Sequence, residues 1–420
     1  AETSMKFIAL HKHSRSATLG VATAATAAKR SEILRDAAHS ERSVRLVSLG
    51  LPQFEPELRA HQDHGFERLG NLGCYIVETD DPQQEQAARE VLEHDYLILP
   101  DIQLSLPVAA STMRRISRAP RDSQWPIESG IAQAHAQGLS GKGVLVGVLD
   151  TGCDADHTEF SQKQIDFRYV PLNPAPDGMR TVRGFDVHGH GTHVCGIIAG
   201  RNIGIAPDVD LMVASVIDSE TVKTSLERIV IALNWMLGQL QKPEHQDRPM
   251  IISMSLGFRS EWISAPVFKS VTDGVQLLLR TLVDDFDVLP VVAIGNDGAG
   301  VIRAPGYFSE ALAVGAVDFD RNVWKNSGSG VSPDGMQKPD IAGYGVNIVS
   351  SLERNIRRRS IYTQMSGTSM ATPYVTGIAA LYASSPARLQ GAALRAHLLN
   401  TALPLNAPPE RVGRGLARFI

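Results

Sequence analysis

Short runs that are apolar at every position recur along the second part of the chain. Amphipathic stretches separate several of them, at 225–241 and 265–286, and their spacing predicts helices. A continuous apolar run predicts a strand buried on both faces, as in a parallel sheet. The alternation therefore predicts a doubly wound α/β domain. The expected strands are 144–150, 211–217, 250–257, 288–296 and 311–317.

The first hundred residues have a different pattern. Strands are expected at 45–51, 73–80 and 95–106, and a capped amphipathic helix at 81–94. This mixture predicts a small α+β unit with an antiparallel, ferredoxin-like sheet. Residues 1–40 add a possible strand, "MKFIAL", and an Ala-rich helix, and are otherwise an unexplained extension.

The segment between the two patterns is polar, basic and interrupted by prolines. Such composition is typical of a linker, where chains are readily cut. We therefore divide the chain into an N-terminal unit (1–106), a linker (107–123) with a candidate processing site, and a second domain (124–420). Cleavage is expected between about 105 and 121, and no internal repeat is evident.

Composition narrows the function classes. The formal net charge of -4 gives no support for a nucleic-acid partner, and the basic run Arg354 to Arg359 is interpreted as a solvated loop. No segment approaches the roughly 18 apolar residues of a membrane span. The cysteines Cys74, Cys153 and Cys195 form neither a disulfide framework nor a paired zinc motif, which favours a reducing compartment.

The compartment itself is left open. The stretch "ATLGVATAATAA" is too rich in Ala and Thr for the apolar region of a secretion signal. A cytoplasmic location is favoured on this ground. A secreted location is expected instead if Ala1 is a processed end.

Four polar residues stand where strands end or helices begin. Asp150 and Asn296 each follow an apolar run, and sites in doubly wound sheets gather at the carboxyl ends of strands. His190 opens "HGTHVCG", and Ser369 lies in "GTSMATP" before an apolar stretch. A serine becomes a good nucleophile when a neutral imidazole takes its proton, and a carboxylate can orient that imidazole. The Asn296 amide and the Ser369 N–H could stabilise an oxyanion.

Each fragment also has a simpler interpretation. Asp-Thr-Gly is often a turn after a strand, and Gly-Thr-Ser is often a helix cap. Three histidines close together, His188, His190 and His193, could bind zinc. However, "HGHGTH" lacks the spacing of HExxH, and no nearby acidic residue completes a ligand set, so no metal is expected here.

Taken together, "VLDTG", "HGTHVCG", "SMSLG", "AIGNDG" and "GTSMATP" resemble the subtilisin-like serine proteases, or subtilases, in the family's own order over about 124–385. The resemblance implies that Asp150 orients, His190 acts as base and acid, and Ser369 attacks. It makes Asn296 the oxyanion donor. It also implies that a peptide substrate adds as a strand to an edge formed by Ser255, Leu256 and Gly257.

The resemblance has further implications. The N-terminal unit would be an inhibitory prodomain, whose end, 97–107, leads into the substrate site beside Ser255, Leu256 and Gly257. Of the three histidines only His190 would be catalytic, with His193 structural and His188 on the surface. No cofactor is required. Glu159 stands where many secreted members have a calcium ligand, but "AGRNIGIAP" is too short for their usual calcium loop, which makes a structural calcium doubtful.

The expected protein is therefore a self-inhibited serine endopeptidase acting on peptides. Two alternatives stay open: a peptide ligase or macrocyclase that uses the same acyl-enzyme, and a pseudoprotease that only binds. Thiol control through Cys153 and Cys195 is a further alternative to their simple burial.

Overall fold

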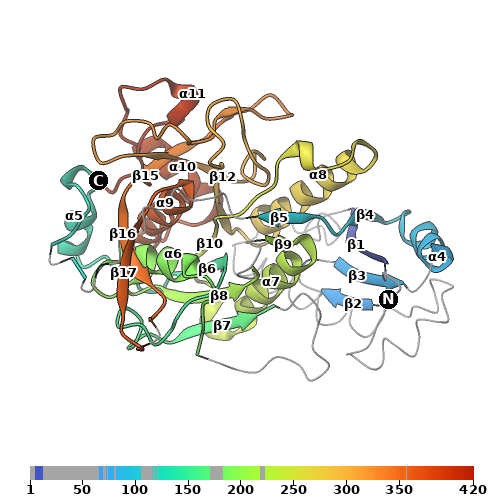
Figure 1. Cartoon of the computed structure of the whole chain (residues 1–420), viewed down its shortest axis with the longest axis horizontal. Helices are drawn as coiled ribbons and strands as arrows, with labels where there is room; N and C mark the ends of the chain where they lie inside the picture. The colour runs from blue at the N-terminus through green and yellow to red at the C-terminus, as the bar shows by residue number, and fades with distance from the viewer. Residues whose placement is uncertain are drawn as a thin grey trace.

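The structure is a computed structural model. It describes residues 5–12, 66–69, 72, 74–79, 82–105, 116, 119–120, 122–170, 183–217, 223–355 and 357–420 (Figure 1). The expected strand at 45–51 and the Ala-rich helix lie outside the described residues, as does most of the linker. In the part that is described, no helix is long and apolar enough to cross a bilayer.

A seven-stranded sheet forms the centre of the second domain. Its order is β15-β12-β11-β10-β6-β8-β7, and every neighbouring pair is parallel. All five expected strands are present in it. The structure adds β7 and β15 at the two edges, where the sequence had predicted no strand. The strands are β6 (Leu145–Asp150), β7 (Ile165–Tyr169), β8 (Asp210–Ser215), β10 (Met250–Met254), β11 (Leu289–Ala293), β12 (Leu312–Val317) and β15 (Ile341–Tyr344).

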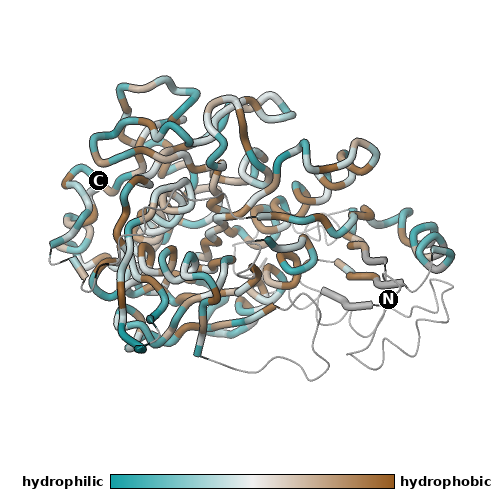
Figure 2. The backbone as a smooth tube through the Cα atoms, viewed as in Figure 1, coloured by the Kyte–Doolittle hydropathy of each residue, from teal (hydrophilic) through white to brown (hydrophobic). Residues whose placement is uncertain are grey.

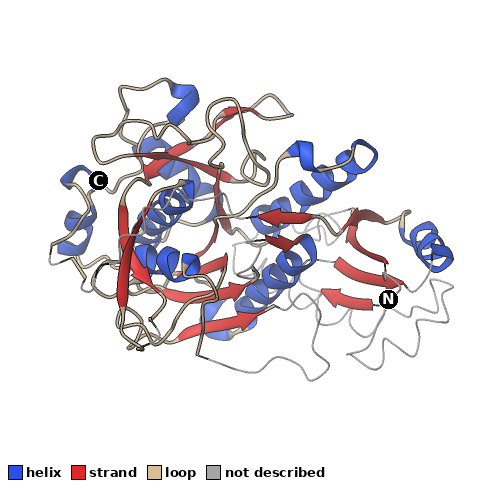
Figure 3. Cartoon of the chain, in the orientation of Figure 1, coloured by secondary structure: helices blue, strands red, loops and turns tan. Residues whose placement is uncertain are grey.

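Helices cover both faces of this sheet, so the predicted doubly wound α/β fold is confirmed (Figure 3). On one face lie α5 (Ile131–Ala136), α6 (His190–Ala199), α9 (Thr368–Ala383) and α10 (Gly391–Thr401); on the other lie α7 (Leu226–Gly238) and α8 (Ala265–Arg280). Side chains alternate along β6, with Val146 and Val148 in the first apolar cluster and Leu145 and Leu149 in the second. The apolar colour of Figure 2 follows these central strands.

Smaller elements surround the sheet. The antiparallel hairpin β16 (Ile348–Leu352) and β17 (Ile361–Met365) packs beside α6. A second short antiparallel pair, β13 (Gly330–Val331) and β14 (Gln337–Lys338), precedes this hairpin in the chain, and the short helix α11 (Pro409–Val412) packs against β14.

The N-terminal unit contains an antiparallel sheet of order β2-β3-β1-β4. This order, with both central strands antiparallel to their neighbours, is that of a ferredoxin-like unit. The possible strand in the extension is β1 (Met5–His11), which occupies the middle of the sheet. The other elements are β2 (Phe66–Leu69), β3 (Cys74–Thr79), α4 (Pro82–Leu92) and β4 (Tyr96–Pro100).

The two units meet along α8. Leu99 of β4 is fully buried and lies so close to Gly274 of α8 that a Cβ there would come within 2.2 Å of the leucine side chain. Leu99 therefore belongs to the same apolar cluster as α7 and α8. Beyond it, β5 (Gln103–Ser105) pairs antiparallel with β9 (Lys223–Ser225) of the second domain (Figure 1).

Candidate active site

Asp150 and His190 form the centre of the candidate site. Asp150 is the last residue of β6 and His190 is the first of α6, and both side chains are buried. His190 Nδ1 lies 2.8 and 3.0 Å from the two carboxylate oxygens of Asp150. Because a carboxylate can only accept, Nδ1 carries the proton and Nε2 is left as the basic nitrogen.

Two opposing effects set the pKa of His190. Burial lowers it, but the charge of Asp150, its hydrogen bond and the smaller effect of Asp186 together raise it by more. The net pKa therefore lies above the ordinary value of 6.5. His190 Nε2 is buried and makes no hydrogen bond with the described residues, so it is available to accept a proton.

Asp186 fixes the start of the histidine helix, a role that the sequence analysis missed. Its Oδ1 accepts the N–H groups of His188 and Gly189 and the Thr151 hydroxyl, while Oδ2 accepts both the N–H and the hydroxyl of Thr192. One carboxylate thus ties the first turn of α6 to the residue after Asp150. An acidic residue just before a predicted helix start was the available signal.

Ser369 is the second residue of α9, a helix that packs against α6. Its Oγ is buried and has no hydrogen-bond partner among the described residues. Its backbone carbonyl accepts a hydrogen bond from the Ser255 hydroxyl at 3.3 Å, which links the helix start to the predicted substrate edge. A polar side chain at the first turn of a helix lies near the positive end of the helix dipole.

Asn296 lies beside the start of the same helix. Its Oδ1 accepts the Thr368 N–H at 2.9 Å and the Thr368 hydroxyl at 2.7 Å. These two bonds fix which amide atom faces Thr368 and leave the Nδ2 group directed elsewhere. These bonds hold the Asn296 side chain against Thr368, the residue before Ser369.

The predicted substrate edge already holds a strand of the chain itself. The Ser105 N–H donates to the Gly257 carbonyl at 3.1 Å, and the Gly257 N–H donates to the Ser105 carbonyl at 3.0 Å. On its other side this strand pairs with β9. Leu256 is fully buried, and a Cβ at Gly257 would come within 2.5 Å of the Ala304 carbonyl oxygen, so the edge requires glycine there. Of the expected segment 97–107, residues 106 and 107 lie outside the described residues.

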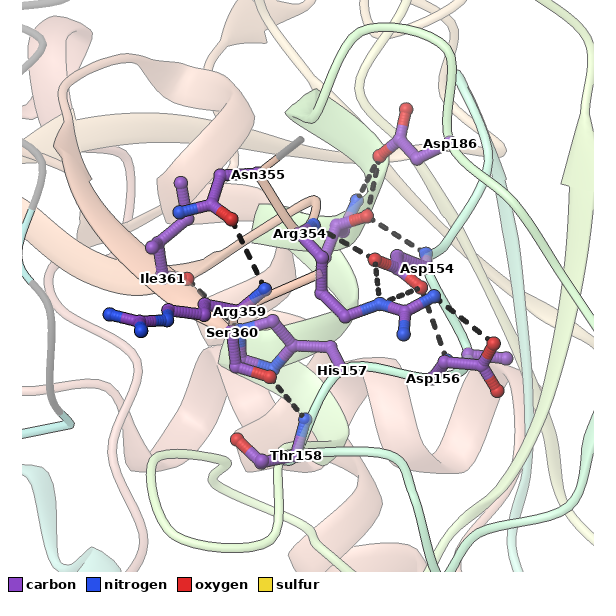
Figure 4. Close-up of polar contacts among 12 residues, drawn as sticks. Asp154, Asp156, His157, Thr158, Asp186, Arg354, Asn355, Arg359, Ser360 and Ile361 are labelled. Carbon is purple, nitrogen blue, oxygen red and sulfur yellow. Dashed lines mark hydrogen bonds and ion pairs between the residues drawn. The ribbon is translucent and has the colours of Figure 1, made fainter. Parts of the chain in front are cut away.

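The loop after Asp150 is held by the hairpin loop between β16 and β17 (Figure 4). The Arg354 guanidinium pairs with Asp154 at 3.0 Å and with Asp156 at 3.1 Å, and the backbone N–H of Arg354 also donates to the Asp154 carboxylate. His157 Nε2 contacts the Ile361 carbonyl at 2.9 Å. The solvated-loop interpretation of the basic run is therefore wrong for Arg354, whereas the three arginines at 357–359 are exposed.

The remaining histidines and cysteines have other surroundings. His188 is exposed, and buried His193 donates through Nε2 to the carbonyls of Ile348 and Thr363. Burial, with the nearby His190 charge, lowers the pKa of His193 to about 3, so it is neutral at ordinary pH. Cys153 and Cys195 are buried free thiols.

Glu159 is not arranged as a calcium ligand. Its carboxylate accepts the Asn202 N–H at 2.8 Å, the Asn202 side-chain amide at 3.1 Å and the Tyr362 hydroxyl at 2.8 Å. A metal ion at this place would have to displace these donors. The described residues contain no cluster of three or more His, Cys, Asp or Glu side chains suited to a metal.

Comparisons with known proteins identify the family of the chain. Residues 141–415 match the model of the subtilase family. The subtilisin-like protease PopC of Myxococcus xanthus (strain DK1622) is 44% identical over 360 residues, which cover 83% of this chain and 75% of that protein. An intracellular serine protease of Paenibacillus polymyxa is 32% identical over 292 residues, 66% of this chain and 79% of its own. The major intracellular serine protease of Bacillus subtilis (strain 168) is 30% identical over 295 residues, 67% and 82% respectively.

The family model matches more than half of the chain, one relative is 44% identical, and the central sheet is parallel. We conclude that this chain belongs to the subtilase family and is a serine endopeptidase.

Proposed function

We propose that the chain hydrolyses peptide bonds through an acyl-enzyme on Ser369, with His190 as the base and Asp150 as its orienting carboxylate. The observation that carries this proposal is the buried Asp150–His190 pair, which leaves Nε2 basic. His190 takes the Ser369 proton as Oγ attacks the carbonyl carbon, and it then gives that proton to the departing amine. Water then attacks the acyl-enzyme while His190 takes its proton, and the carboxylic acid product is released as the proton returns to Ser369.

The negative charge of the tetrahedral intermediate needs donors that are already in place. The Asn296 amide, oriented through Thr368, and the Ser369 N–H supply them at the start of α9. Proton transfer through His190 and this oxyanion stabilisation account for the chemistry without a cofactor. A substrate peptide would bind as a strand between β9 and the 255–257 edge, as Ser105 does.

The N-terminal unit acts in this proposal as an inhibitor joined to its own enzyme. Ser105 makes the two backbone bonds to Gly257 that a substrate residue would make. On the far side of the undescribed stretch, Ile116 exchanges two backbone bonds with Tyr362 of β17, at 2.7 and 2.8 Å. A tethered segment has a high effective concentration, so modest contacts are enough to exclude substrate. Release would require a cut in the linker.

The test is an intact-mass time course of the full chain beside Ser369→Ala, with fluorophosphonate labelling in parallel. Wild type should take up one label at Ser369 and hydrolyse peptides, and Ser369→Ala should do neither. Loss of kcat is expected at ~10⁶-fold, a size taken from subtilisin itself and not from this structure. Substantial peptidase activity in Ser369→Ala would contradict the assignment. Linker cleavage in the wild type alone would support self-processing.

A further inference from the structure

Arg303 lies at the substrate edge and reaches the strand bound there. Its Nη1 is 3.3 Å from the Ser105 hydroxyl oxygen, and it is buried with 5% of its surface exposed. Its neighbour Ala304 pairs with Phe258 through two backbone hydrogen bonds of 2.8 and 3.0 Å. The arginine therefore lies on the segment that pairs with the one carrying Gly257.

The guanidinium is held in one orientation. Nε and Nη2 donate to the two carboxylate oxygens of Asp297 at 2.7 and 3.1 Å, a two-point pairing that fixes the plane of the group. The Trp262 ring lies 5.0 Å from the guanidinium carbon and is half exposed. Two of the five N–H groups are thus used by Asp297, which leaves Nη1 directed at Ser105.

Glycines make room for this side chain. A Cβ at Gly295 would come within 3.0 Å of the Arg303 Cγ, and one at Gly257 would come within 3.2 Å of the Arg303 Cβ. Gly295 also has a φ of +114°, which other residues rarely adopt. The backbone therefore fixes the position of the Arg303 side chain, which differs in this from a mobile surface arginine.

Side chains of a bound strand alternate between two surroundings. Leu104, one residue before Ser105, is buried in the apolar cluster of α7 and α8. Ser105 points to the opposite side, where Arg303 is its polar partner. A substrate strand in the same register would present alternate residues to the apolar cluster and to Arg303.

We propose that Arg303, held by Asp297 and Trp262, is a specificity-determining residue that selects the substrate side chain in the place of Ser105. This rests on the proposed function, because it treats Ser105 as standing where a substrate residue binds. Nη1 can only donate, so it favours side chains that accept hydrogen bonds, namely Ser, Thr and Asp. It disfavours Ala, which leaves the donor unpaired, and Lys, which brings a second positive charge.

The first experiment compares the cleavage sites of the full wild-type chain and of Arg303→Met in a peptide library, read by mass spectrometry. At the substrate position that takes the place of Ser105, on the amino side of the cut bond, the wild type should prefer Ser or Asp over Lys by roughly tenfold. Arg303→Met should lose that preference and keep the apolar preference at the preceding position.

The double variant Arg303→Met/Asp297→Asn controls for the unpaired carboxylate. Arg259→Met controls for loss of a nearby arginine, since Arg259 pairs with Glu261. An unchanged profile in Arg303→Met would overturn the proposal.

The second experiment needs no peptidase activity. In full-length Ser369→Ala protein, Ser105→Asp and Ser105→Lys are compared by hydrogen exchange at the Gly257 amide, which donates to Ser105. Asp should protect this amide roughly tenfold more than Lys while Arg303 is present. The difference should vanish with Arg303→Met, and a difference of equal size in both backgrounds would overturn the proposal. Absence of hydrolysis and of fluorophosphonate labelling in the wild type would count against the proposed function, while this comparison would still decide the role of Arg303.

Discussion

Ser105 and Gly257 exchange two backbone hydrogen bonds, so a residue of the N-terminal unit occupies the edge predicted to bind substrate. This pairing does not depend on the identity of the Ser105 side chain. It depends on the Ser105 N–H, which only proline lacks. Substitutions at Ser105 can therefore separate the contribution of the backbone to self-inhibition from that of the side chain.

Ser105→Pro should weaken self-inhibition in the full chain. Loss of one hydrogen bond of about 1 kcal/mol predicts a roughly fivefold higher initial rate on a fluorogenic peptide. Ser105→Ala keeps both backbone bonds and should change the rate less. Intact mass shows whether each chain is still uncut, and a melting curve shows whether it is folded. Equal rates for the proline and alanine variants would mean that the pairing does not inhibit.

Asn296→Ala should lower kcat far more than it raises KM. The amide stabilises charge that develops only in the transition state, and the corresponding loss in subtilisin is roughly 100- to 1,000-fold. Thr368→Val keeps the Thr368 N–H but removes the hydroxyl that helps to orient Asn296, so a smaller loss is expected. Steady-state kinetics on one peptide check both variants. A change confined to KM would remove Asn296 from the oxyanion role.

The central strands and the polar residues at their ends could be predicted because both are local signals. Asp150 ends a strand and His190 begins a helix, and the apolar pattern of both elements is continuous. The edge strands β7 and β15 were missed: β7 is mostly half-buried, with a mixed pattern, and β15 is a short run containing Gly343. Contacts between distant loops were missed as well. The Arg303–Ser105 contact leaves no spacing signal in the sequence, because folding alone brings those segments together. Most bonds to Asp186 are local, to His188, Gly189 and Thr192, and there the acidic residue before the helix start was a signal that the sequence analysis did not use.

The rate of hydrolysis should rise with pH through the pKa of His190. The base must be neutral. Burial lowers its pKa, but the effects of Asp150 and Asp186 together outweigh burial and raise the pKa above 6.5. Activity should therefore be low in the protonated range and reach a plateau above neutrality. The measurement is kcat/KM against pH. A rate that stays constant across the range in which imidazole titrates would exclude histidine as the base.

Asp186→Asn should lower the pKa seen in that same profile. The Asp186 charge is one of the effects that raise the pKa of His190, and asparagine keeps the size of the side chain without the charge. The activity curve should shift toward lower pH, and kcat should fall because the first turn of α6 is held less firmly. Thr192→Val, which removes one hydroxyl bonded to Asp186, is the neutral control and should not shift the curve. A loss of kcat with an unshifted profile would leave Asp186 with a purely structural role.

His193→Gln should remove part of the acid sensitivity of the fold. The pKa of His193 is about 3 in the folded protein against 6.5 when unfolded, so the unfolded state binds more protons between these values. The stability that depends on a neutral His193 is present above pH 6.5 and is lost as the pH falls toward 3. The slope is about 1.4 kcal/mol of unfolding free energy per pH unit.

Glutamine can still donate to the Ile348 and Thr363 carbonyls but does not titrate. Urea unfolding at pH 7 and pH 5 should therefore show a smaller loss in the variant than in the wild type, with Ser369→Ala in both chains to prevent self-digestion. The same loss in both would mean that His193 is not the group that takes up the proton.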